Sequence, residues 1–322
     1  MDSMSTASHR FVLLLSFAAL AFLPATAQAP SAGARRGPGG PRNPNPYFLR
    51  RSLAEIQEKA VDISSASAHY KPMYGDGDTG PRILRGVVRY GELTVDPGGT
   101  SALVSYPEEE QIYYILEGAG TLLYGGQRVP LKADDFVYLP VDVKHGVSNS
   151  SKAPCRLLVM GFHIPGDMEI KPTPKLLIAN AADVQVEPTH GPGTKFKLLL
   201  GDKGSTRDKL VAAHIVTSLF LMEFDPGIDN FPHAHEAEEE IYFILKGHGE
   251  IATGQGPTAT EGRYPVKAGD AYFIRVNGTV GFYRDKAGEN PTILAVRSRY
   301  PFQKVKDTWS PIEVVPEPKR KR

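Results

Sequence analysis

From residue 86 to residue 296 the chain alternates short apolar runs with turns rich in glycine and proline. Short runs bounded by these residues are typical of strands rather than helices. The runs are 86–95, 112–116, 121–124, 136–139, 156–162, 211–224, 241–245, 271–274 and 292–296. Because so many follow one another, we predict an all-β chain of antiparallel barrels or double-sheet jelly rolls. Such barrels leave an open mouth where a ligand can bind.

The strand pattern occurs twice. An Asp-Pro-Gly turn at 96–98 returns at 225–227, and the block 110–120 returns as 239–249, both at an offset of 129 residues. An internal repeat of this kind indicates two domains of similar fold. We therefore expect a first domain at 81–168, a linker at 169–204 and a second domain at 205–302.

The first 27 residues have the pattern of a secretory signal peptide. His9 and Arg10 precede an apolar run over 11–23, which is shorter than the roughly 20 residues that span a bilayer. Small residues at 25–27 fit a cleavage site, and an uncleaved anchor is the alternative. We expect an exported protein of bacterial type, periplasmic or secreted, with no membrane segment after cleavage.

The segments that flank the repeats are less regular. Residues 28–49 are rich in Gly, Pro, Ala and Arg and indicate a flexible leader. Ser52 and Glu55 form a capping box, which predicts a short helix at the start of the segment 50–80, either packed on the body or acting as a lid or dimer arm. The tail 303–322 ends in four basic residues and is interpreted as solvated.

Composition excludes several classes of protein. The 322 residues are 41% hydrophobic and 23% charged, which is ordinary for a globular protein. A formal charge of +1 argues against a nucleic-acid partner. Cys155 is the single cysteine, so neither an internal disulfide nor a cysteine metal cluster can form.

A candidate metal motif lies in the second repeat. His233 and His235 stand two residues apart, Glu240 follows after a short turn, and Gly227 and Gly247 bound the segment. On an extended chain the two imidazoles share a face. Two imidazoles and one carboxylate suit one divalent transition metal, Fe, Mn, Ni, Cu or Zn. The alternative is a pair of surface histidines beside an acidic run.

This motif, inside a duplicated strand pattern, resembles the first motif of the cupin superfamily. A second family motif is matched in the first repeat by Pro140, His145 and Asn149, with Asp134 and Asp142 at two glycine positions. The chain therefore resembles a bicupin, a protein with two cupin domains. At the level of the motif it is similar to quercetin dioxygenases. The resemblance implies two jelly-roll domains with a metal inside a barrel.

Because of its departures from the family pattern, we expect a metal site in the second repeat and none in the first. The first repeat has Val104, Tyr106 and Gln111 where ligands are needed, so we expect no metal there and a hydrogen-bonded His145. In the second repeat Val280 takes the place of the fourth ligand. The resulting two-histidine, one-carboxylate face has open positions for water, oxygen or a chelating substrate. Other candidates for the fourth ligand are His214, Glu223 and His248.

Two functions fit these residues. The first is a metal-dependent enzyme, either dioxygenase-like or a Lewis-acid catalyst, that acts on a small organic molecule. Glu240 would then also accept a proton, and Arg275, near the expected barrel mouth, would anchor a substrate carboxylate or else be an exposed turn residue. The second is a small-molecule or metal-binding protein without enzymatic activity. A homodimer is expected by resemblance only.

Overall fold

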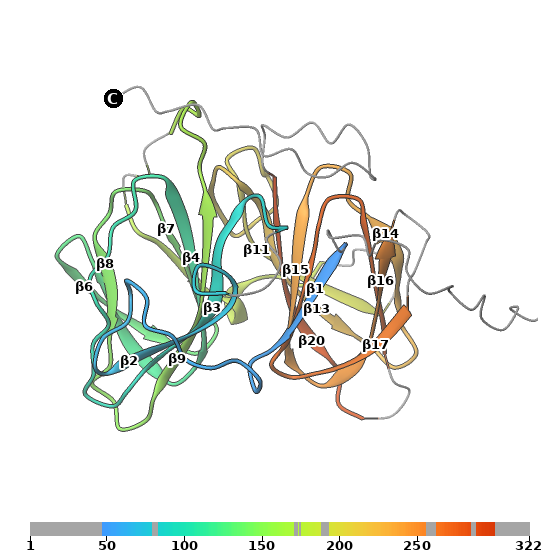
Figure 1. The fold of residues 1–322 in the computed structure, drawn as a ribbon, viewed down its shortest axis with the longest axis horizontal. Helices are drawn as coiled ribbons and strands as arrows, with labels where there is room; N and C mark the ends of the chain where they lie inside the picture. Colours follow the sequence, from blue (N-terminus) through green and yellow to red (C-terminus); the bar gives the residue numbers. More distant parts are fainter. Residues whose placement is uncertain are drawn as a thin grey trace, which may run out of the picture. The chain divides into compact units, whose positions relative to one another are not determined.

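A computed structural model describes residues 47–78, 83–170, 173, 175–187, 193–255, 262–284 and 288–299. The predicted signal peptide, nearly all of the leader and the C-terminal tail lie outside these residues. Among the described residues, none forms a helix long and apolar enough to cross a membrane. The described chain folds almost entirely into strands, as the sequence pattern predicts (Figure 1).

Two barrels account for these strands. The first contains β2 (Ala68–Gly75), β3 (Val87–Val95), β4 (Glu109–Glu117), β5 (Ala119–Tyr124), β6 (Gln127–Lys132), β7 (Asp135–Leu139), β8 (His145–Ser148), β9 (Cys155–His163) and β10 (Leu177–Asn180). The second contains β1 (Phe48–Ser52), β11 (Thr194–Asp202), β12 (Leu210–Ala213), β13 (Val216–Phe224), β14 (Asn230–Ala234), β15 (Glu239–Lys246), β16 (His248–Gln255), β17 (Gly262–Lys267), β18 (Asp270–Ile274), β19 (Gly278–Arg284) and β20 (Thr292–Ser298). A short 3₁₀ turn, η1 (Ala181–Asp183), follows β10.

The two barrels repeat one strand order. In the first, the large sheet has the order β10-β7-β4-β9-β3-β2 and faces a small sheet β6-β5-β8. In the second, the orders are β1-β18-β15-β20-β13-β11-β12 and β14-β19-β16-β17. The central run β7-β4-β9-β3 therefore corresponds to β18-β15-β20-β13. Each barrel closes its sheets over an interior, which reduces the number of exposed strand edges.

Alternation of side chains along the strands divides the apolar residues among three cores. Tyr113 of β4 packs inside the first barrel, and Tyr242 of β15 packs inside the second. Their neighbours Tyr114 and Phe243 point the other way and belong to a third cluster, which we call the shared core because both barrels contribute to it. Neighbouring side chains on β4 or β15 therefore lie in different cores, one inside its own barrel and the next in the shared core.

Two family glycines are replaced without loss of the backbone turn. Asp134 and Asp142 adopt positive φ angles of 65° and 61°, and their counterparts Gly269 and Asn277 have φ of 87° and 60°. Aspartate and asparagine tolerate this left-handed region better than most residues with a side chain. The departures from glycine noted in the sequence therefore leave the turn geometry intact.

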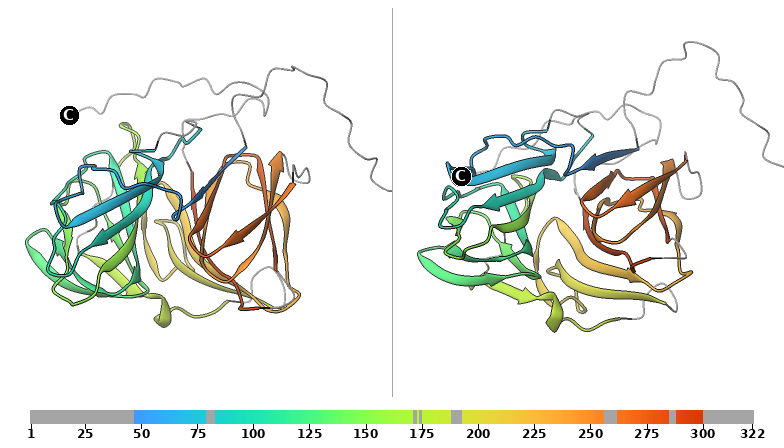
Figure 2. Two further views of the ribbon diagram at one scale, coloured as in Figure 1. Left: turned by 60° about the horizontal axis from the view of Figure 1, so that its bottom comes forward. Right: turned by 90° about the horizontal axis from the view of Figure 1, so that it is seen from below.

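The N-terminal segment differs from expectation, because no helix forms at the capping box. Ser52 ends strand β1, where it pairs with Asp270 of β18, and the Leu53 N–H donates to the Gly269 carbonyl (3.0 Å). A turn follows over 53–55. Pairing with a sheet edge and burial of Leu53 outweigh a local capping preference. Figure 2 shows β1, in blue, beside the orange strands of the second barrel.

The segment 169–204, expected as a linker, also contains strands. β10 pairs with β7 of the first barrel, and β11 pairs with β13 of the second. The connection between the barrels is thus shorter than the sequence indicates, since its two ends are sheet strands.

Candidate metal centre

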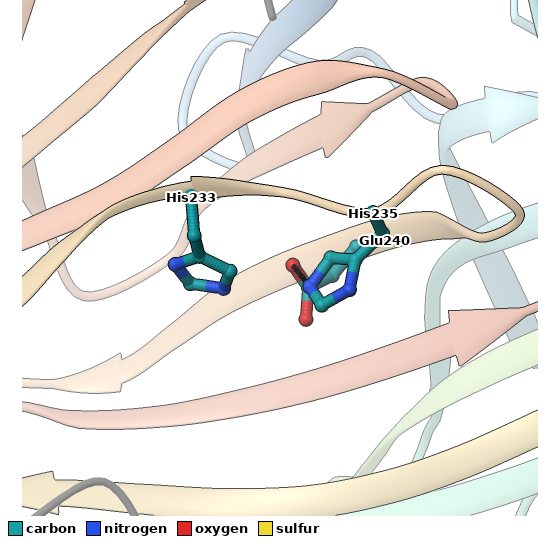
Figure 3. A group of neighbouring side chains, drawn as sticks. All are labelled: His233, His235 and Glu240. Atoms are coloured by element: carbon teal, nitrogen blue, oxygen red, sulfur yellow. Dashed lines mark ion pairs between the residues drawn. The ribbon is translucent and has the colours of Figure 1, made fainter. Parts of the chain in front are cut away.

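Two neighbouring strands bring the three candidate ligands together. His233 lies on β14, His235 lies just beyond its end, and Glu240 is the second residue of β15. One ligand atom from each side chain lies within 4.8 Å of the others. Figure 3 shows the three side chains on the same side of their strands. The convergence expected from the spacing is present, and the remaining question is what the cluster binds.

The immediate contacts of the cluster suit a cation. His233 Nδ1 lies 2.9 Å from the Phe231 carbonyl and donates to it, so the ring presents Nε2 as its ligand nitrogen. His235 Nε2 and Glu240 Oε2 lie 3.4 Å apart as an ion pair, and both atoms are buried with no hydrogen-bond partner among the described residues. Buried polar atoms are seldom left unsatisfied, and a metal ion bound by both atoms would satisfy them. The residues present therefore fit a divalent ion.

Other charged groups surround the cluster. Glu238 Oε2 lies 3.7 Å from His235 Nδ1, where it can orient the ring. Arg297 of β20 is paired across the sheet with Glu240, and its Nε lies 3.9 Å from Glu240 Oε1. Burial lowers the pKa of His235, but the adjacent Glu240 carboxylate outweighs burial, so the net pKa is raised above its ordinary value.

Arg297 and Glu238 are the site residues that sequence reasoning missed. Arg297 Nη1 lies 3.5 Å from Glu238 Oε2, and its Nε is buried with no hydrogen-bond partner in the part of the chain that the structure describes. The guanidinium also lies over the Phe220 ring, 5.1 Å from its centroid. Glu238 stands in the acidic run of the motif, which gave a local signal. Arg297 lies far along the chain, and only the β15–β20 register places it at the site.

The fourth ligand position is apolar, as the sequence indicates. Val280 of β19 pairs with His233 and is fully buried in the interior of the second barrel. The described residues bring no other His, Asp, Glu or Cys into the cluster. His214, Glu223 and His248, considered as replacements, are therefore not part of it.

Arg275 does not accompany Glu240. Its neighbour Ile274 pairs with Glu240 and packs inside the second barrel, whereas the Arg275 guanidinium lies over the Tyr47 ring, 4.6 Å from the centroid. Burial lowers the pKa of Arg275, and Tyr47 and Glu239 partly oppose this shift. Glu239 points away from Glu240 because successive side chains of a strand alternate. Arg275 is buried rather than an exposed turn residue.

The corresponding position in the first barrel holds a hydrogen-bonded histidine. Val104 pairs with His145, just as His233 pairs with Val280 in the second barrel. The Tyr106 carbonyl accepts a hydrogen bond from the turn that follows β7, as the His235 carbonyl does from the turn that follows β18. His145 Nδ1 lies 2.7 Å from the Val143 carbonyl, and Nε2 lies 3.0 Å from Gln111 Oε1. The ring is therefore engaged with protein atoms on both sides.

An arginine fills the space beside this histidine. Arg89 is buried, its Nε donates to Glu109 Oε1 at 2.7 Å and its Nη1 to Asp62 Oδ1 at 2.8 Å. Its guanidinium stacks 4.4 Å from the centroid of Tyr106. A protein cation thus already neutralises the carboxylates of this interior, which opposes the entry of a second cation.

Arg89 and Arg297 lie on strands that do not correspond in the two barrels. Arg89 is on β3, which pairs with β9, whereas Arg297 is on β20, the counterpart of β9. In the first barrel Arg89 pairs with Gly161, and in the second Ser218 pairs with Arg297. In each barrel a small residue faces the arginine across the strands. A Cβ on Gly161 would collide with Glu109 and Arg89, so the glycine is needed there for space.

A separate cavity of about 800 Å³ lies beside the shared core, lined among others by Tyr114, Phe243 and Lys197. None of the three candidate ligands lines it. The chemistry of the cluster is therefore assigned to the barrel interior and not to this cavity.

Comparison with known proteins agrees with the architecture. The family model for the cupin domain matches twice, at residues 91–161 and 220–283, once in each barrel. An uncharacterized protein of Methanocaldococcus jannaschii, MJ1618, is 30% identical over 83 residues, which cover 26% of this chain and 66% of that protein. The match spans slightly less than two thirds of that relative. The two cupin domains and the repeated topology show that the chain is a bicupin of the cupin superfamily.

Several solved structures share the fold at low sequence identity. Protein Ylba of E. coli is 14% identical with a TM-score of 0.61, and the match covers 82% of this chain and 95% of that one. The oxalate decarboxylase of Lactobacillus farciminis, solved as a formate complex, is 13% identical with a TM-score of 0.59, over 79% and 86%. The Bacillus subtilis oxalate decarboxylase OxdC, which has Mn(II) centres, is 13% identical with a TM-score of 0.58, over 80% and 78%. At these identities the likeness concerns the fold.

Proposed function

We propose that the protein is a metal-dependent enzyme that holds one divalent transition metal, Fe, Mn, Ni, Cu or Zn, with His233, His235 and Glu240 and acts on a small carboxylate-bearing molecule. The observation that carries the proposal is the convergence of one ligand atom from each of the three side chains within 4.8 Å, with the facing His235 and Glu240 atoms buried. When bound, the metal supplies Lewis-acid polarisation of an oxygen atom of the substrate.

The protein residues prepare this chemistry. Arg297 neutralises Glu240 and offers a planar fork of N–H donors to a substrate carboxylate, which makes it a better anchor than Arg275. Glu238 lies 3.7 Å from the Nδ1 side of the His235 ring, and Glu240 lies 3.4 Å from its Nε2 side. Val280 keeps the fourth position free of a protein ligand, which leaves room for substrate or water.

The substrate class follows from the charge of the site together with the relatives. Oxalate decarboxylases share the fold, and a guanidinium stands beside the candidate metal here. We therefore favour short carboxylic acids, such as oxalate, among the small organic molecules considered. Oxygen-dependent cleavage remains the second branch of the same proposal, since the open positions also suit dioxygen.

A binding protein without catalysis is the second candidate function. The observation that favours it is the loss of ligands, with Val280 in the second barrel and Val104, Tyr106 and Gln111 in the first. Reconstitution with each of the five metals, followed by assays of carbon dioxide release from oxalate and of oxygen uptake, separates the candidates. Turnover that requires metal supports the enzyme. Tight metal binding without turnover of any carboxylic acid tested supports the binding protein.

We also propose that the chain is exported. The support is the sequence of residues 1–27 alone. Cell fractionation of a C-terminally tagged full chain tests this, with mass spectrometry of the mature N-terminus. A start at Gln28 in the periplasm or medium agrees with the proposal, and an intact N-terminus in the cytoplasm contradicts it.

A further inference from the structure

Each repeat sends one buried carboxylate across to the other barrel. In the first barrel this is Glu110 of β4, which is 0% exposed. Its Oε1 accepts the N–H groups of Ile215 (2.8 Å) and Val216 (3.0 Å), and its Oε2 accepts that of His214 (2.8 Å). The Tyr138 hydroxyl also donates to Oε2 at 2.8 Å. The carboxylate thus binds the backbone that leads into β13 of the second barrel.

Glu239 of β15 makes the reciprocal contact. It is 2% exposed, its Oε1 accepts the Arg85 N–H and its Oε2 accepts the Gly86 N–H, both at 2.9 Å. These two N–H groups belong to the backbone that leads into β3 of the first barrel. We call the Glu110 and Glu239 contacts the two carboxylate clasps.

The clasps are related by the internal repeat. An offset of 129 residues takes Glu110 to Glu239, and the same offset takes Arg85 and Gly86 to His214 and Ile215. Both the acceptor and its donors therefore recur, which makes the arrangement a property of the duplicated fold. Burial shields these hydrogen bonds from water, and it also raises the pKa of Glu239 to about 7.

The two clasps differ in what stands next to them. The residue after Glu110 is Gln111, which takes part in the His145 network. The residue after Glu239 is Glu240, the candidate ligand, which points to the opposite face of β15. The start of β15 is therefore held on one face by backbone of the first barrel while its other face presents a ligand atom.

We infer that Glu239 is a positioning residue for Glu240, and that the first barrel acts through it as a scaffold for the metal centre of the second. This inference rests on the proposed metal site. Ligand groups must be held closely in place to bind a metal well, and supporting contacts behind the ligands commonly change metal affinity about 10- to 100-fold. It gives the ligand-poor first barrel a role in a protein whose metal chemistry lies in the second.

The matched pair of clasps provides the test. In Glu239→Gln one carboxylate oxygen becomes an NH₂ group facing a backbone N–H, so one hydrogen bond is lost and two donors oppose each other. Glu110→Gln makes the corresponding substitution in the other clasp, where each carboxylate oxygen accepts two hydrogen bonds. Both variants are made in the full chain, and Mn²⁺ binding is measured by calorimetry and by the EPR signal of the free ion. Urea unfolding of the metal-free proteins gives the cost to stability.

We expect both variants to lower the urea midpoint, and Glu239→Gln alone to raise the Mn²⁺ Kd, by about tenfold or more. Glu110→Gln should leave the Kd within about twofold. Equal Kd changes in the two variants, or none in Glu239→Gln, would overturn the inference and leave the metal site standing. Absence of Mn²⁺ binding and of Zn²⁺ binding by the wild-type chain would remove both the site and the inference.

Hydrogen exchange supplies a second readout that a purely structural clasp would not move. Because coupling between two sites is reciprocal, Zn²⁺ binding should slow amide exchange at Gly86 more than at Ile215. Equal slowing at both positions counts against the inference. If Glu239→Gln does not fold, Glu239→Asp and Glu110→Asp keep the charge and shorten the reach, and the same difference in Mn²⁺ Kd is expected.

Discussion

Acidification should destabilise the first barrel through His145. The ring is 1% exposed, and burial lowers its pKa to about 4 from an ordinary 6.5, helped by Arg89 and opposed by the Val143 carbonyl and Asp62. The folded chain therefore excludes a proton that the unfolded chain binds below about pH 6.5. Stability is fully present above that pH and is lost as pH falls toward 4.

The size of the loss follows from the two pKa values. Between pH 7.5 and 4.5 the shift corresponds to about 2.5 kcal/mol of unfolding free energy. A charged ring could donate to both the Val143 carbonyl and Gln111 Oε1, whereas a neutral ring has a single N–H, so this value is the largest loss expected.

Urea unfolding of wild type and His145→Gln at the two pH values isolates the histidine, because the amide does not titrate and other carboxyl groups are common to both proteins. Wild type should lose up to about 2.5 kcal/mol more than the variant on acidification. Proton NMR of the ring, assigned by its absence in the variant, measures the pKa directly. A ring that titrates at or above pH 6.5, with no difference in urea, would refute the reasoning.

Three further predictions follow from the described contacts. Arg297→Leu should weaken binding of oxalate to the metal-loaded protein by about tenfold or more, since the charge partner of the substrate carboxylate is lost, while metal content stays near wild type; calorimetry checks both. Gly161→Ala should destabilise the chain by about 1–3 kcal/mol through collision with Glu109 and Arg89, whereas Ser218→Ala, at the matching position of the second barrel, should change urea stability by less than about 1 kcal/mol. Chelation of the metal should lower the melting temperature, because a ligand at 100 times its Kd stabilises the folded state by about 2.7 kcal/mol, and a melting temperature unaffected by chelator and by added metal would count against a resident ion.

Much of the fold can be predicted from the sequence because the patterns that specify it are local or repeated. Strand runs follow from alternation and turn residues, and the duplication is visible as an offset of 129 residues. His233, His235 and Glu240 lie within eight consecutive residues, so their convergence needs one short turn and no knowledge of the rest of the barrel.

The parts that sequence reasoning missed depend on pairing between distant segments. Arg297 reaches the site because β20 lies beside β15, and no local spacing reports that register. The sequence predicts Arg275 near the barrel mouth, but it is Ile274, the last residue of β18, that packs in the interior of the second barrel. Ser52 begins a good helix-capping sequence, but in the structure it is the last residue of β1 and pairs with β18.

The carboxylate clasps show the same limit. The Glu-Gln and Glu-Glu pairs at 110–111 and 239–240 are visible in the repeat, but their opposite directions emerge only when each strand is placed between two packed environments. One residue of each pair then faces the other barrel while its neighbour faces its own.

Metal content of the purified chain tests the central claim most directly. Elemental analysis should find about one Fe, Mn, Ni, Cu or Zn per wild-type chain after metal-supplemented expression, nearly none in His233→Ala or His235→Ala, and an unchanged amount in His145→Ala. A metal-free wild type, or a metal that His145→Ala removes as fully as His235→Ala does, would contradict the assignment of a metal centre to the second barrel.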